Sequence, residues 1–356
     1  MGEKPMDQAK AEVFANTAFV DVAAAFTVTM CAIGNRLGLF KILGSDGPAT
    51  SSELAKRAGI NERYSLEWLS ALTCAGYLDY NPDSQRFALP REHAPVLAHE
   101  GGPLFMGGTH QQMPPTLKPV DQVIQAFRNG GGISQSVYGH DYWVGFERLT
   151  NSWFENLLTQ RWIPAMPGLQ QKLRQGATVA DVGCGNGRAL IKMAKIYPES
   201  RYVGYDNHPP SIEYAVRNAQ EAGVTNKARF VELDVTDGFP EKYDLITTFD
   251  VIHDMVNPRR ALKAIRNALK PDGTNLLLDF NSSDKLEEEI GPIGTMLYGV
   301  SVMFCMTTSL AEGGEGLGTA GFHPKKVREL CLEAEFSSVR RLPLDDPLNI
   351  LYEIRP

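Results

Sequence analysis

From position 178 onward, short apolar runs typical of β-strands alternate with helical patterns, and this alternation constrains the fold more than any other feature. Strands and helices that alternate along a chain form βαβ units, in which each helix returns the chain for the next parallel strand. The pattern predicts an α/β, Rossmann-like doubly wound sheet with helices on both faces. The expected strands are Thr178–Val182, Arg201–Tyr205, Ala228–Leu233, Tyr243–Phe249, Asn275–Phe280, Val339–Leu344 and Asn349–Ile354.

A second, mainly helical domain is expected before this sheet, because 356 residues exceed the usual size of one domain, about 100–200 residues. Thr50 and Glu53 have the spacing of a capping box, Gly59 is placed to end that helix, and Asn61 is placed to begin another. A predicted β-hairpin follows over residues 77–89. Two short helices and a hairpin predict a winged helix.

The segment Ala11–Leu43 predicts helix with apolar residues on most sides. A helix of this kind must be buried, and a short N-terminal segment cannot bury it alone, so we expect a homodimer formed through the N-terminal domain. Its longest apolar stretch, Val22–Ile33, is shorter than the roughly 20 residues that cross a bilayer. No secretory signal pattern precedes it, so we expect a cytoplasmic protein without membrane contact.

Charge argues against nucleic acid as a partner. The net charge is −7, whereas phosphate backbones are bound by clustered Lys and Arg. Between positions 50 and 90, four basic residues face five acidic ones, so dimerisation is favoured over DNA binding for the winged helix. The five cysteines are scattered without a C-x-x-C pair, which indicates neither a disulfide framework nor a zinc site.

We expect three segments in all: a helical and winged-helix dimerisation domain (1–95), a helical connector that covers the active site (96–160), and the α/β domain (161–356). The connector is rich in aromatic residues, and an apolar insertion lies between positions 282 and 322. Either segment is suited to contact an apolar substrate, and core packing is an equally good interpretation of the same residues. The candidate substrate contacts are Trp143, Phe146, Trp153, Met296 and Met303.

A glycine run follows the first strand in the sequence D-x-G-x-G-x-G, from Asp181 to Gly187. Glycines let the backbone turn sharply and approach a ligand closely, and the following helix presents free N–H groups. Arg188 stands where the dinucleotide fingerprint needs a third Gly or Ala, so the run does not fit that fingerprint. Acidic residues also end the next two strands: Asp206, about 20 residues on, is suited to a ribose, and Asp234 follows the third strand.

With these motifs in this order, the chain resembles the class I S-adenosylmethionine-dependent methyltransferases. The resemblance implies S-adenosylmethionine as cofactor, with the adenosine held by Asp206 and Asp234, and the methionine part by Asp181 and the glycine loop. Phe249 and Asp250, after the fourth strand, would border the methionine end. The full expected cofactor set is Asp181, Gly183, Cys184, Gly185, Asn186, Gly187, Asp206, Asn207, Asp234, Val235, Phe249 and Asp250.

His253 follows the fourth strand in the stretch Ile252-His253-Asp254. An imidazole at a strand end can take a proton from an acceptor hydroxyl. The stretch also resembles the Leu-His-Asp-Trp segment of the plant-type small-molecule O-methyltransferases and their bacterial relatives, which open with a dimerising winged helix. This resemblance implies that His253 is the general base and that Asp254 or Asp279 orients it. The chain departs from the family at two positions: Asp279 stands where the family has Glu, and Met255 replaces the family's Trp. A structural role for His253 as a loop cap is the alternative.

The expected function is methyl transfer to the hydroxyl of a small, apolar or aromatic molecule. Asp250, Asp279 and Asn281 come nearest to a metal-ligand set, but Phe280 splits the Asp-Asn pair of the metal-dependent enzymes, so no metal is expected. Two alternatives stay open: an N- or C-methyltransferase that works by positioning, and a winged-helix regulator that binds S-adenosylmethionine.

Overall fold

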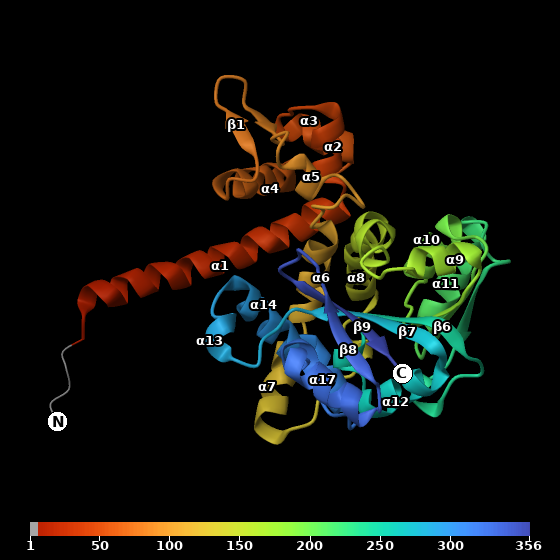
Figure 1. Cartoon of the computed structure of the whole chain (residues 1–356). Helices are drawn as coiled ribbons and strands as arrows, with labels where there is room; N and C mark the ends of the chain where they lie inside the picture. The colour runs from red at the N-terminus through yellow and green to blue at the C-terminus, as the bar shows by residue number, and fades with distance from the viewer. Residues whose placement is uncertain (1–5) are drawn as a thin grey trace, which may run out of the picture. The chain divides into compact units, whose positions relative to one another are not determined.

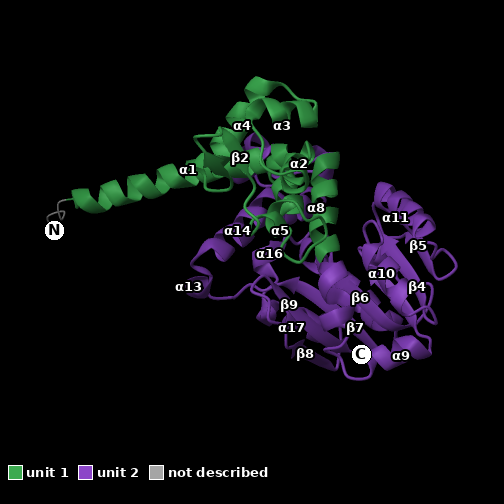
Figure 2. Cartoon of the chain, turned by 90° about the horizontal axis from the view of Figure 1, so that it is seen from above, with its two compact units in different colours: residues 1–115, 140–152 green, residues 116–139, 153–356 purple. Residues whose placement is uncertain are grey.

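The computed structural model describes residues 6–356, which form two compact units (Figure 2). The first unit contains the chain up to Pro115 together with residues 140–152. The second contains residues 116–139 and 153–356. Segment bounds at positions 95 and 160 stay a prediction, and each unit is described by itself.

The first unit is a helical domain with a winged helix, as the sequence predicts. Thr50 accepts from the Glu53 N–H while Glu53 accepts from the Thr50 N–H, so the capping box is formed. Gly59 ends that helix in the left-handed conformation, and Asn61 caps the next. The elements are α1 (Gln8–Arg36), α2 (Leu39–Asp46), α3 (Ser51–Ala58), α4 (Glu62–Cys74), the antiparallel hairpin β1 (Asp79–Asn81) and β2 (Arg86–Ala88), α5 (Ala94–Leu97), α6 (Gly107–Leu117) and α8 (His140–Trp153).

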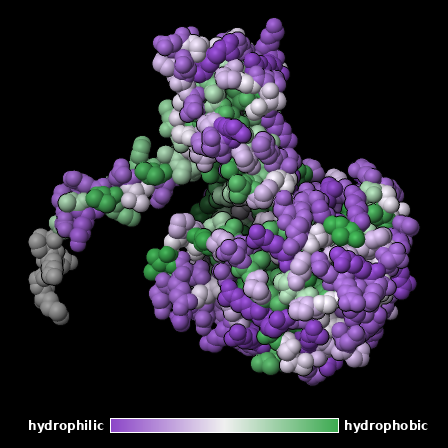
Figure 3. All heavy atoms as spheres, turned by 45° about the horizontal axis from the view of Figure 1, so that its top comes forward, coloured by the Kyte–Doolittle hydropathy of each residue, from purple (hydrophilic) through white to green (hydrophobic). Residues whose placement is uncertain are grey.

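Helix α1 is long and largely uncovered within its own unit (Figures 1 and 3). Its C-terminal turns pack on α4, where the Trp68 indole N–H donates to the Met30 carbonyl at 2.8 Å. Farther toward the N-terminus, Phe14 and Phe19 are 72% and 71% exposed. The expected single helical stretch is divided at Gly38, which has φ 69°. The chain by itself therefore does not cover this helix, and its burial by a second copy stays a prediction.

The second unit is built on a seven-stranded sheet in the order β5-β4-β3-β6-β7-β9-β8. Strands β5, β4, β3, β6 and β7 run parallel to one another. Strand β9 pairs antiparallel with β7 on one side and with β8 on the other. All seven expected strands are present, and only β7 is much longer than predicted. The strands are β3 (Thr178–Val182), β4 (Arg201–Asp206), β5 (Ala228–Glu232), β6 (Tyr243–Phe249), β7 (Leu269–Phe280), β8 (Ser338–Leu342) and β9 (Asn349–Arg355).

Hydrophobic residues cover both faces of this sheet. Successive strand residues point to opposite faces, and accordingly Val179 and Leu276 belong to one core while Ala180 and Leu277 belong to the other. The helices and helical turns of the unit are α7 (Val120–Asn129), η1 (Gln135–Val137), η2 (Phe154–Trp162), α9 (Leu169–Gln175), α10 (Arg188–Ile196), α11 (Pro209–Glu221), η3 (Val235–Asp237), η4 (Ile252–Asp254), α12 (Pro258–Ala268), α13 (Leu286–Glu289), α14 (Pro292–Val300), η5 (Ser301–Cys305), α15 (Met306–Ala311), α16 (Gly318–Gly321) and α17 (Pro324–Glu333).

Residues 116–139 belong to this second unit because they bind the helical run α14-η5-α15. The run changes to π-helical hydrogen bonding at η5, which disturbs the regular pairing of carbonyl groups. The Tyr138 hydroxyl donates to the Met303 carbonyl, and the Ile133 N–H donates to the Thr307 carbonyl at 3.0 Å. Gly132 lies so close to Thr307 that a Cβ would be 1.9 Å from its carbonyl oxygen.

Candidate functional site

The predicted site residues lie where four neighbouring strands end. In the order β5-β4-β3-β6 the strands are parallel, so their carboxyl ends share one edge of the sheet. The glycine loop follows β3, Asp206 ends β4, Asp234 follows β5, and Asp250 follows β6. This edge is the usual ligand crevice of an open α/β sheet.

The loop after β3 has a backbone that requires glycine. Gly183, Gly185 and Gly187 have φ of 64°, 50° and 76°. At Gly183 a Cβ would lie 2.4 Å from a methyl carbon of Val251, whereas at Gly185 nothing lies within 4 Å. The loop therefore packs tightly on one side and leaves open space on the other, beside the start of α10, where backbone N–H groups can meet a polar ligand.

Asp206 connects the end of β4 to the glycine loop. One of its carboxylate oxygens accepts from the Gly185 N–H and the other from the His208 N–H, both at 2.9 Å. Burial raises the pKa of Asp206 above its usual value, and these hydrogen bonds offset the rise only in part. The carboxylate thus holds the loop in place and keeps lone pairs for a ligand.

The other two strand-end acids differ in exposure. Asp181 is buried, accepts from the Thr247 hydroxyl at 2.6 Å, and burial raises its pKa to about 7. Asp234 is exposed and accepts from the Thr236 N–H at 2.9 Å.

The remaining predicted cofactor contacts also lie along this edge but face different surroundings. Asn186 is held through its carbonyl by Asn218, and Asn207 is exposed. Cys184 and Val235 are buried, and Phe249 packs in the core against the ring of Trp162, with centroids 5.5 Å apart. A ligand-binding role for each of them stays a prediction.

His253 sits on η4 directly after β6 and is almost completely buried. Its Nδ1 atom lies 2.9 Å from Asp279 Oδ1 and 3.7 Å from Asp250 Oδ1. The N–H is not well aligned with either oxygen, so the contact is an ion pair rather than a well-directed hydrogen bond. Burial lowers the pKa of His253, but the Asp279 carboxylate and Cys305 more than offset this and hold the pKa well above its usual value.

Of the two predicted partners of His253, the structure brings Asp279 into contact. Asp279 comes from the end of β7, next to β6 in the sheet. Asp254 acts on His253 only through its charge, and burial raises the pKa of Asp254 to about 6. Asp250 has φ 56°, and burial raises its pKa to about 7.

Two residues that contact the predicted site residues were not predicted from sequence. Cys305, on η5, interacts with the His253 imidazole, and burial raises the pKa of its thiol to about 11, so it stays protonated. Thr247, on β6, holds Asp181. No local pattern marks either residue, because both depend on which strands and helices become neighbours.

A metal ion would also suit the spacing of Asp250, His253 and Asp279, whose ligand atoms lie within 4.8 Å of one another. We interpret the three as an ion-pair cluster, since the His253 nitrogen nearest the carboxylates already contacts Asp279 directly. The expectation that no metal is needed stays a prediction.

The predicted substrate contacts are divided between the two units. Trp143 and Phe146 lie on α8 in the first unit, both partly buried. Trp153, Met296 and Met303 belong to the second unit, and Met296 on α14 is 39% exposed. Their role as substrate contacts stays a prediction.

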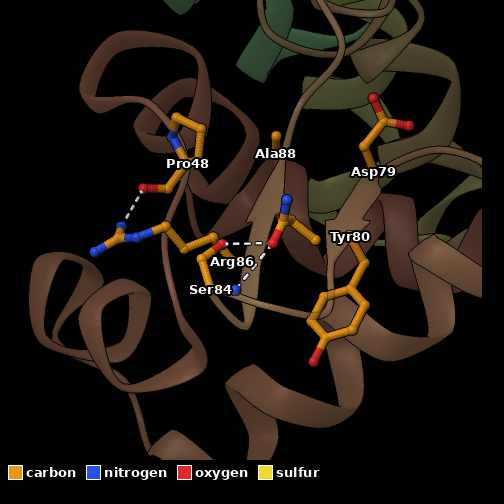
Figure 4. A pocket seen from close by; sticks show the side chains of 7 residues that line it. Pro48, Asp79, Tyr80, Ser84, Arg86 and Ala88 are labelled. Carbon is orange, nitrogen blue, oxygen red and sulfur yellow. Dashed lines mark hydrogen bonds between the residues drawn. The ribbon is translucent and has the colours of Figure 1, made fainter.

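A hollow of about 300 Å³ lies beside the β1-β2 hairpin of the first unit (Figure 4). Several of its polar groups are paired: Arg86 donates to the Pro48 carbonyl and to Glu53, and Asn81 accepts from Ser84.

Comparison with known proteins agrees with both units. A family model described as a methyltransferase domain matches residues 173–313, and one described as an Rv2258c-like winged HTH domain matches residues 24–99. The methyltransferase ungE' of Aspergillus campestris is 33% identical over 130 residues, 32% of this chain and 37% of that protein. A ubiquinone biosynthesis O-methyltransferase of Cereibacter sphaeroides is 28% identical over 111 residues, 31% of this chain and 44% of that protein. The matched part is thus less than half the length of either relative.

Solved structures match over the whole chain. The mitomycin 7-O-methyltransferase MmcR has a TM-score of 0.73 at 20% identity, covering 98% of this chain and 99% of that one. Human N-acetylserotonin methyltransferase in complex with SAM has a TM-score of 0.71 at 17% identity, covering 100% and 99%. These likenesses establish the fold. The two family models, together with the glycine and acidic motifs, identify in this chain a methyltransferase domain preceded by a winged-helix domain.

Proposed function

We propose that the protein transfers a methyl group from S-adenosylmethionine to the hydroxyl group of a small molecule. The observation that carries this proposal is the single sheet edge that holds both a glycine turn with open space at Gly185 and a buried His253–Asp279 pair. A loop that can meet a ligand and a proton acceptor thus come from adjacent strand ends, which is the arrangement that methyl transfer to a hydroxyl requires.

The residues present fit the cofactor. Asp206 would accept hydrogen bonds from the two ribose hydroxyls while keeping its bond to the Gly185 N–H, and the exposed Asp234 would accept from the adenine amino group. Near the proposed methionine end, Asp250 Oδ1 and Asp279 Oδ2 are buried without hydrogen-bond partners among the residues that the structure describes. Buried polar atoms seldom stay unpaired, so these atoms support a polar or cationic ligand there. When bound, the cofactor supplies an electrophilic methyl group.

His253 would take the proton of the acceptor hydroxyl. Because its Nδ1 faces Asp279, we propose that its Nε2 takes the proton. The base acts in its neutral form, and its pKa is raised, so we expect the methyl-transfer rate to increase as pH rises above neutral. Within the second unit, the apolar insertion with Met296 and Met303 would then shape the acceptor site.

The test is to incubate the protein with methyl-labelled S-adenosylmethionine and a panel of phenols and hydroxylated metabolites, and to identify labelled products by mass spectrometry. We expect His253→Ala still to bind the cofactor and to lose the rising limb of the pH–rate profile. A variant that kept this limb would favour N- or C-methylation by positioning alone. Absence of cofactor binding by calorimetry would refute the proposal itself.

A regulator that binds DNA through the winged helix is the second candidate, and charge disfavours it. Of the basic residues around the wing, Arg86 is paired with Glu53 and Arg63 with Glu67. Salt-sensitive binding to a DNA library without methyl transfer would decide for that function.

We also infer that two copies associate through α1, whose exposed Phe14, Phe19 and Phe26 need a cover. By length and composition α1 and the stretch Pro292–Ala311 are each apolar enough to cross a membrane, and 44% of the second is buried. A second copy accounts for the apolar face of α1 in a cytoplasmic protein, and equilibrium sedimentation tests it.

A further inference from the structure

The cluster around His253 contains more acid than base. Asp250, Asp254 and Asp279 surround a single imidazole, with Asp250 and Asp279 only 8% and 1% exposed. One oxygen of each of these two carboxylates, Asp250 Oδ1 and Asp279 Oδ2, has no hydrogen-bond partner within residues 6–356. The imidazolium can balance at most one negative charge, and an uncompensated buried charge is strongly unfavourable.

The neighbouring elements bring two more carboxyl groups, two neutral thiols and one more imidazole. From β3 and β4, Asp181 and Asp206 act on each other, and Asp206 also acts on Asp254. From η5 comes Cys305, a thiol that stays neutral, and from the glycine loop comes Cys184, also a neutral thiol. His208, which acts on Asp206, is the other imidazole among these groups. The edge of the sheet is therefore suited to a cation.

We propose that the carboxylates around His253 recognise the positive sulfonium of the methyl donor, so that the donor binds with release of a proton and more tightly than its neutral sulfide product. The inference rests on the proposed function, because only a site for S-adenosylmethionine brings a sulfonium here. It assigns a product-release role to Asp250 and Asp279: once the methyl group has left, the ligand is uncharged and the carboxylates no longer hold it.

The protonation behaviour of the cluster agrees with this assignment. Burial raises the pKa of Asp250 to about 7 and that of Asp254 to about 6, so both carry protons part of the time near neutral pH. A cation bound beside them lowers these pKa values, as it lowers that of His253, and a proton passes to solvent. The preference for the charged ligand is then largest above these pKa values and is lost as pH falls below them.

Isothermal titration calorimetry of the full chain measures this directly. S-adenosylmethionine and S-adenosylhomocysteine are titrated at several pH values between 5.5 and 8.5, in buffers of different ionisation enthalpy. If the sulfonium lowers the pKa of one group by one unit, the affinity ratio of donor to product increases about tenfold over this range. Proton release should accompany donor binding and be smaller for product. The amino groups of the two ligands cancel in the ratio.

Variants separate the cluster from the rest of the site. Asp250→Asn should weaken donor binding, leave product binding unchanged and reduce the pH dependence of the ratio; Asn tolerates the left-handed backbone at this position, φ 56°. Asp234→Asn is the matched control, which should weaken both ligands equally. Equal affinities for donor and product at every pH, with no difference in proton release, would overturn the inference alone. Failure of both ligands to bind would overturn the proposed function instead.

Discussion

Asp206→Asn is the substitution that most sharply tests the adenosine half of the site. The carboxylate accepts one backbone N–H on each oxygen, from Gly185 and from His208, both at 2.9 Å. An amide has a single oxygen, so its NH₂ group must face one of these N–H donors. That donor is left without a partner, which costs about 1–3 kcal/mol of folding stability when the group is buried.

The effect on the cofactor adds to this. Hydrogen bonds to a charged group contribute about 1.5–3 kcal/mol, and losing one to a ribose hydroxyl raises Kd about 10- to 100-fold. Because both cofactor forms share the adenosine, S-adenosylmethionine and S-adenosylhomocysteine should weaken by the same factor.

Calorimetric titration of both ligands measures these affinities, and thermal unfolding reports the stability. The matched control is Asp237→Asn, the same change at a side chain that is 75% exposed and paired with Arg260, where affinity should stay unchanged. If Asp206→Asn folded and bound both ligands as the unmodified protein does, the assignment of Asp206 to the ribose would be refuted.

Further substitutions and treatments test other parts of the structure. Gly183→Ala should lower the melting temperature and abolish cofactor binding, because φ is 64° and the new Cβ would lie 2.4 Å from Val251, whereas Gly299→Ala, with no atom within 4 Å of its Cβ, should change little. Asp279→Asn should lower the pKa of His253 in an NMR titration of the imidazole, since the Asp279 charge opposes the effect of burial; an unchanged pKa would contradict the ion pair. Dialysis against a chelator should leave cofactor affinity and melting temperature unaltered, and a loss restored by one divalent ion would place a metal at Asp250, His253 and Asp279. Phe14→Asp with Phe19→Asp should yield monomers in sedimentation, while Asn16→Asp at an exposed position should not.

Most of the sheet follows from local sequence. Each parallel strand is a short apolar run followed by a turn and a helix, so the order of elements and the positions of Asp206 and Asp234 at strand ends can be predicted. The capping box at Thr50 and Glu53 is equally local, because its two hydrogen bonds join residues three positions apart.

Features that depend on which segments meet could not be predicted. Whether Asp254 or Asp279 contacts His253 is decided by β7 lying next to β6, and Cys305 reaches the same imidazole from a helix about 50 positions away in the chain. Helix α1 shows the same limit: its apolar pattern predicts that another surface covers it but cannot specify which residues of that surface contact it.

The path of the chain has a practical consequence for dissecting this protein. Because residues 116–139 belong to the second unit and residues 140–152 to the first, the polypeptide passes from one unit to the other three times. A fragment that starts at residue 161 would omit Tyr138 and Ile133, and the Met303 and Thr307 carbonyls would lose their donors. Neither unit can be excised by a single cut. We therefore expect proteolysis in the segment 116–139 to destabilise both units.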